Sequence, residues 1–179
     1  MALAVGVGVV VELPQPVFVV GDAVFSPAHG LCEVMTIERR DIDGAALEFY
    51  VIRIIQGSHI QLVVPVLRAR AVGLRRPIDR QRAALVLGVF KEQQSAVEGI
   101  PPVRQIRHYE QLLHSGSAED VARVLRDLLR LRMRKELSFG QRRLLDSARR
   151  MLVQEVALAF GDTEASVERR FDEALGAGV

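Results

Sequence analysis

The stretch VGDAVFSPAHGLCEV (residues 20–34) decides how the first half of the chain folds. Apolar residues stand at strand spacing on both sides of the segment SPAHG (residues 26–30), which contains a proline and ends on a glycine. Such a segment is typical of a turn between two strands. It also contains His29 and is followed by Cys32, the single cysteine of the chain, a combination that the rim of an active site can hold. A turn and a catalytic rim are both open interpretations of these residues.

Strand-like runs continue on both sides of this stretch. Five short strands are predicted, at residues 17–20, 23–25, 31–37, 47–55 and 59–66. Asp43-Gly44 is a dipeptide typical of tight hairpin turns, and residues 56–58 (QGS) supply a further turn. Pro65 marks where the last strand stops pairing, because proline has no backbone N–H. Strands this short and closely spaced favour a small, strongly bent sheet or barrel.

In the second half the apolar residues recur every three to four positions, as on one face of a helix. Ser117 is placed as an N-cap, and Ser138 with Gln141 has the spacing of a capping box. Helices are predicted from Asp79 to about Gln94, from Arg104 to His114, from Ser117 onward, from Ser138 to near Gly161, and from Asp162 through Leu175.

The change of apolar period predicts an α+β protein with two domains. A β domain is expected over residues 17–76 and an all-α domain over residues 78–176. Residues 1–16 are apolar but lack the positive segment of a signal peptide, and we interpret them as an unstructured leader. One cysteine permits neither an internal disulfide framework nor a thiolate zinc site, which favours a reducing, cytoplasmic location.

Charge is unevenly distributed along the chain. Residues 1–78 balance seven Arg against seven acidic residues, whereas residues 104–150 hold twelve Lys and Arg against six acidic residues. A basic segment of this size can bind a polyanion, or its arginines can solvate the outer faces of helices. The densest run, Arg130 to Lys135, we interpret as a solvated helix face.

Residue patterns that carry catalysis are missing. The sequence has no G-x-x-x-x-G-K-[ST] loop, no G-x-S-x-G and no H-E-x-x-H. His29, His59 and Cys32 form the one combination that suggests a metal site or an activated thiol, although a buried, inert cysteine is the commoner case. We therefore predict a binding protein with no catalytic residue, cofactor, metal or small-molecule ligand, and without a membrane partner.

Two ordered sets of motifs resemble the CarD/CdnL family of bacterial transcription regulators. The set in the β half is VGD (20–22), PAHG (27–30), YVIR (50–53), VVP (63–65) and VGLR (72–75). The set in the helical half is VARVLRDL (121–128), LSFGQRR (137–143) and ARRMLVQEVALA (148–159). The β half alone is also similar to the polymerase-interacting module of transcription-repair coupling factors, which are long ATP-driven translocases.

The resemblance implies a Tudor-like β domain that docks on the β subunit of RNA polymerase. It implies a helical domain that touches promoter DNA at the upstream edge of the opened bubble and stabilises the open complex without chemistry. Such a protein would act on the nucleoid, with DNA contacts largely independent of sequence. The alternative is an adaptor that binds polymerase through protein contacts without productive DNA contact.

The resemblance also assigns candidate contact residues. Arg40 occupies a basic position that contacts polymerase, Arg39 and Arg53 lie near it, and Val63 stands where the family has a second basic residue. For DNA, the family places a Trp four residues before a Tyr, and counting back from Tyr109 gives Gln105. The basic DNA candidates are Arg104, Arg107, His108, Arg142 and Arg143. Ile106 and Tyr109 are left as possible replacements for the apolar wedge.

Overall fold

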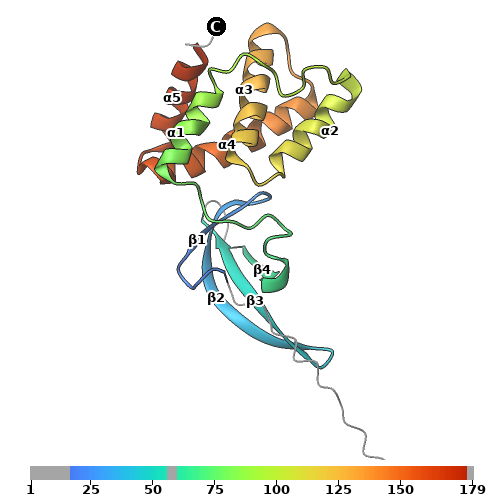
Figure 1. Cartoon of the computed structure of the whole chain (residues 1–179), viewed down its shortest axis with the longest axis vertical. Coiled ribbons are helices and arrows are strands. Elements are labelled where there is room, and N and C mark those ends of the chain that lie inside the picture. The colour runs from blue at the N-terminus through green and yellow to red at the C-terminus, as the bar shows by residue number, and fades with distance from the viewer. Residues whose placement is uncertain (1–16, 56–59, 177–179) are drawn as a thin grey trace, which may run out of the picture.

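The computed structural model describes residues 17–55 and 60–176, and these form a curled sheet followed by a block of helices (Figure 1). The strands are β1 (Ala23–Ser26), β2 (Gly30–Ile42), β3 (Ala45–Ile54) and β4 (Gln61–Pro65). The helices are the 3-10 turn η1 (Val66–Arg68), α1 (Arg80–Val89), α2 (Pro102–Leu113), α3 (Ala118–Arg134), α4 (Phe139–Phe160) and α5 (Glu164–Gly176). The α+β class is confirmed. The predicted leader, the turn at 56–58 and His59 lie outside the described residues.

The sheet is antiparallel with strand order β1-β2-β3-β4. A fifth strand at residues 17–20 was expected, and that prediction is wrong. The N–H groups of Val17 and Phe18 donate to the hydroxyl of Tyr50 at 2.8 and 3.2 Å. Asp22 N–H donates to the carbonyl of Val19 at 3.0 Å, which closes a turn. Because a side chain and a turn take up these groups, this segment does not pair along a neighbouring strand.

The β2–β3 hairpin is long and extends away from the helices (Figure 1). Asp43 and Gly44 both have positive φ, at 53° and 79°, and they join Ile42 to its partner Ala45. This is the geometry of the two-residue hairpin turn that the dipeptide predicted. A β-bulge between Val34 and Thr36 then changes which side chains of β2 face the core.

The β domain has its own apolar core, which includes Val24, Cys32, Tyr50 and Ile52. Burial raises the pKa of the Cys32 thiol to about 11, so the thiol stays protonated at neutral pH and is a poor nucleophile. Within residues 17–55 and 60–176, no three His, Cys, Asp or Glu side chains are grouped to hold a metal ion.

The helical domain confirms the caps predicted at Ser117 and Ser138, whereas the cap expected at Asp162 lies at Thr163, which accepts a hydrogen bond from Ser166 N–H at 3.2 Å. Ser117 accepts a hydrogen bond from Asp120 N–H at 3.3 Å. Ser138 and Gln141 form the reciprocal capping box, and α4 ends at Gly161 in the left-handed conformation with φ 66°. None of the helices in the described parts of the chain is long and apolar enough to cross a membrane.

The end of α1 differs from the prediction, because the helix stops at Val89 rather than near Gln94. The fully buried guanidinium of Arg126 on α3 donates to the carbonyls of Val89 and Gln94 at 3.0 and 2.6 Å. Arg130 donates to the carbonyls of Phe90 and Glu92 at 3.0 and 2.7 Å. These contacts satisfy carbonyls after α1 and hold the following segment against α3. Arg130 therefore has a structural role and is not part of a freely solvated face.

The Arg126 guanidinium also pairs with the buried carboxylate of Asp127, its neighbour in sequence, at 2.8 Å. Asp127 in turn accepts hydrogen bonds from Ser95 Oγ and Ala96 N–H, both at 2.7 Å. The pair thus connects α3 to the loop that leads from α1 to α2, and so helps to place α2.

The segment SPAHG is a turn between β1 and β2, as one of the two interpretations predicted. Ser26 pairs with Gly30, and His29 N–H donates to the carbonyl of Ser26 at 3.2 Å. Gly30 has φ 76°, and a Cβ there would lie 2.8 Å from Oε1 of Gln154 on α4. The turn therefore needs glycine both for its backbone conformation and for its close approach to the helical domain.

A buried ion pair joins the two domains next to this turn. Arg75 lies near the end of the β domain and pairs with Glu155 of α4, whose side chain is 1 % exposed. Glu155 also accepts a hydrogen bond from Ile78 N–H at 3.0 Å. Phe25 of β1 lies under the Arg75 guanidinium, 4.5 Å from it, and packs into the core of the helical domain. These contacts fix the sheet to α4.

Candidate interaction surfaces

Three of the residues predicted to contact polymerase, Arg40, Arg53 and Val63, lie on one face of the sheet. Tyr50 and Ile52 of β3 point into the β-domain core, so Val51 and Arg53 point to the opposite face. Val63 of β4 pairs with Val51 and shares that face.

After the β-bulge, Arg40 of β2 pairs with Leu47 of β3. Leu47, Phe49 and Val51 are alternate residues of β3 and share one face, so Arg40 lies on the same face as Val51. We call the face formed by Arg40, Phe49, Val51, Arg53 and Val63 the docking face.

Arg39 does not belong to the docking face. It pairs with Glu48 of β3, which has the same strand phase as Tyr50 and Ile52. Because successive side chains of a strand point to opposite sides, Arg39 and Arg40 face away from each other. The structure therefore separates two residues that the sequence places side by side.

Both arginines of the docking face are held by neighbouring side chains. Arg40 Nη2 lies 2.7 Å from the carboxylate of Glu38, and its guanidinium lies 5.5 Å above the centre of the Phe49 ring. Arg53 Nη2 lies 2.7 Å from the carboxylate of Glu33 across the strands. These side chains are partly exposed, so the ion pairs add little to stability and can exchange for a partner's groups.

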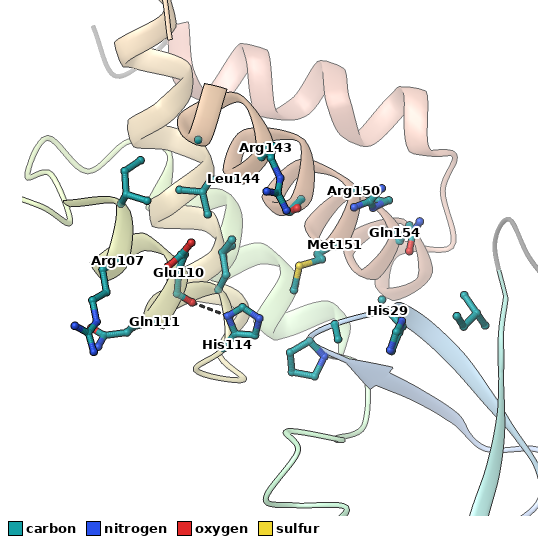
Figure 2. A pocket seen from close by; sticks show the side chains of 18 of the residues that line it. His29, Arg107, Glu110, Gln111, His114, Arg143, Leu144, Arg150, Met151 and Gln154 are labelled. Carbon is teal, nitrogen blue, oxygen red and sulfur yellow. Dashed lines mark hydrogen bonds between the residues drawn. The ribbon is translucent and has the colours of Figure 1, made fainter. Parts of the chain in front are cut away.

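On the helical domain, a cleft of about 1420 Å³ lies between α2, α4 and the β1–β2 turn (Figure 2). A Cβ on Gly140 of α4 would lie 3.6 Å from Cδ1 of Ile106, so the second turn of α2 lies beside the first turn of α4. Arg107 of α2 and Arg143 and Arg150 of α4 are among the residues that line the cleft. We call this the arginine cleft.

The arginine cleft concentrates unpaired positive charge. Arg107, Arg143 and Arg150 are exposed, and within the described residues none of them lies in an ion pair. Among the described residues that line the cleft, Glu110 is the single carboxylate, and its backbone carbonyl interacts with His114 Nδ1 at 2.7 Å. Three cations against one anion give the cleft a net positive potential suited to an anionic partner.

Two further DNA candidates lie along α2. Arg104 and His108 line a shallow depression with Arg107 at the start of the helix. Arg142, in contrast, points away from the arginine cleft and pairs with the exposed Glu136 at 3.3 Å. The structure thus places Arg104, Arg107, His108 and Arg143 on neighbouring parts of α2 and α4. Arg142 lies outside the arginine cleft.

The structure gives Gln105 a local role. Its amide Nε2 donates to the carbonyl of Ile100 at 2.9 Å and so holds the loop before α2. Of the two suggested replacements for the apolar wedge, Tyr109 is buried and Ile106 is partly buried in the lining of the arginine cleft. Tyr109 is 3 % exposed, and burial raises its pKa above the usual range. Ile106 packs against the helical core.

Arg150 was not among the predicted site residues. It lies seven residues after Arg143, and this spacing places both side chains on one side of an α-helix. That spacing is the feature of the sequence that could have identified it. In sequence it stands in the segment LLDSARRMLV (residues 144–153), whose pattern predicts only an amphipathic helix.

Comparison with known proteins assigns both domains. Residues 18–78 match the model of the CarD-like/TRCF RID domain, and residues 85–172 match the model of the CarD C-terminal domain. The curated protein named "Putative transcription factor YdeB" of Bacillus subtilis (strain 168) is 24 % identical over 151 residues. That alignment covers 84 % of this chain and 97 % of the relative.

A Tudor-like sheet followed by a helical domain, with both domain models matched, places the chain in the class of transcription regulators. The chain belongs to the CarD/CdnL family.

Proposed function

We propose that this protein is a non-enzymatic regulator that binds the β subunit of RNA polymerase and promoter DNA together. The docking face, with Arg40, Arg53 and Val63, meets the polymerase. The arginine cleft meets DNA at the upstream edge of the bubble. The observation that carries the DNA half is the gathering of unpaired arginines between α2 and α4, while Arg123 and Arg149 nearby are paired with carboxylates.

The proposed mechanism is a shift of population. A protein that binds the melted promoter complex more tightly than the closed one raises the ratio of melted to closed complex, at saturation, by that ratio of affinities. Arginine contacts to phosphates position the protein without reading sequence. The buried junction between the domains sets where the cleft lies once the sheet has docked. The protein would act on the nucleoid, in the cytoplasm, and needs no cofactor or small-molecule ligand for this.

DNA binding should therefore depend on salt in a defined way. If about three arginines contact phosphates, the slope of log K against log salt should be near −2 to −3. The double variant Arg107→Ala/Arg143→Ala should reduce that slope by about 2 units and shorten the lifetime of the open complex. Fluorescence anisotropy across a salt series measures the slope, and competitor-challenged transcription measures the lifetime.

Arg149→Ala is the matched control, because Arg149 lies on the same helix but pairs with Glu168 at 2.8 Å. It should leave the slope unchanged. The adaptor alternative is favoured by Gln105, whose amide is engaged with Ile100 instead of reaching outward. An unchanged open-complex lifetime in the double variant, with polymerase binding intact, would support the adaptor and contradict the DNA half of the proposal.

A further inference from the structure

We propose that Phe139 is the apolar contact of the DNA interface, stacking on a base that the opened duplex exposes. This inference rests on the proposed function and adds a residue that the family resemblance does not supply. Phe139 begins α4 and is 70 % exposed. The other phenylalanines are buried or half-buried, and the half-buried one, Phe160, lies beneath Arg80 and Arg170. Phe139 alone among them presents an open ring face.

The position of Phe139 links it to the arginine cleft. Residues four and eleven positions further along an α-helix lie within about 40° of the same side, and here these are Arg143 and Arg150. The next residue, Gly140, lines the cleft and contacts Ile106 of α2. The aromatic ring therefore lies at the end of a row of unpaired cations.

A second exposed apolar residue comes from the neighbouring helix. Val103, near the start of α2, is 87 % exposed and lies one turn before Arg107. Since Ile106 of α2 lies beside Gly140 of α4, Val103 is a second exposed apolar residue on the helix that neighbours the start of α4.

This combination fits nucleic acid. Aromatic rings stack on bases whose faces are open, and cations beside them bind the phosphates of the same strand. Apolar side chains can also insert at a distorted base step. A regular duplex offers no open base face, whereas the edge of a bubble does. A stacked Phe139 would thus supply a preference for melted DNA, which phosphate contacts alone provide poorly.

The test compares two DNA probes with the full-length chain: a fully paired promoter duplex and a forked duplex with unpaired bases at the upstream edge. Phe139→Ala should weaken binding to the forked duplex about fivefold or more. Its binding to the paired duplex and its salt slope should stay close to those of the wild type. Phe139→Trp should restore the preference for the fork, because it keeps an aromatic face.

Met133→Ala is the matched control, because Met133 is also 70 % exposed but lies near the end of α3. It should bind both probes as the wild type does. Thermal unfolding curves of the three variants should overlay, since the altered side chains are exposed. Equal fork binding by Phe139→Ala and wild type would overturn this inference alone. Wild-type protein that binds neither probe would overturn the proposed DNA contact, and this inference with it.

Discussion

Arg126→Met is expected to lower the free energy of unfolding by about 3–5 kcal/mol, the usual cost of breaking a buried ion pair from one side. The methionine fills similar space but donates no hydrogen bond. The carboxylate of Asp127 would stay buried without its cation, and the carbonyls of Val89 and Gln94 would lose their donor. Urea unfolding followed by circular dichroism measures the loss.

Arg123→Met is the control for this change. Arg123 lies one turn earlier on α3, is partly exposed and pairs with Asp120 at 2.7 Å. Exposed pairs of this kind contribute at most about 1 kcal/mol. If Arg126→Met and Arg123→Met lost equal stability, the assigned role of the buried pair would be wrong.

Glu155→Ala is expected to cost about 3 kcal/mol and to separate the unfolding of the two domains. Glu155 is 1 % exposed, while its partner Arg75 keeps some access to solvent, which limits the loss. Without this carboxylate, Arg75 and Ile78 N–H lose their common acceptor. The sheet would then be held to α4 mainly by Phe25 and the β1–β2 turn. Calorimetry should show two transitions where the wild type shows one.

The control here is Glu168→Ala, which removes the exposed partner of Arg149 from α5. It should keep a single transition and lose at most about 1 kcal/mol. A single, unshifted transition for Glu155→Ala would mean that the ion pair does not couple the domains.

Local signals in the sequence predicted much of the fold. A cap requires only residues within one helical turn, so Ser117 and the box of Ser138 with Gln141 could be identified directly. The turn at Asp43-Gly44 likewise depends on two neighbouring residues with positive φ. In each case the partners are close in sequence and no tertiary contact decides the outcome.

The errors came from contacts between distant residues. Residues 17–20 have strand-like composition, but their N–H groups bond to a tyrosine hydroxyl more than thirty positions away. Residues after Val89 have helix-forming composition, but Arg126 and Arg130 of α3 take up the carbonyls there. The composition of a segment cannot reveal such hydrogen bonds, because the partner groups lie on another element.

The candidate surfaces show the same limit. Charge and family resemblance predicted Arg107 and Arg143, which the structure brings to one cleft. The β-bulge between Val34 and Thr36, which decides that Arg40 and not Arg39 shares a face with Val51, has no clear signal in the sequence. Phe139 stands inside a capping motif, so its sequence context indicates a helix start and not an exposed ring.

The central claim is that one defined face of the sheet holds the polymerase while the helical domain holds DNA. The most direct test is the affinity of the purified polymerase β subunit for three full-length proteins: wild type, Arg40→Glu and Arg39→Glu. The two variants make the same charge change on adjacent residues of β2 that point to opposite faces.

Binding of the β subunit should weaken about tenfold or more in Arg40→Glu, because a carboxylate would replace a guanidinium at the contact. Arg39→Glu should bind as the wild type does. A β subunit that ignores the wild-type chain, or that binds Arg40→Glu undiminished, would contradict the claim.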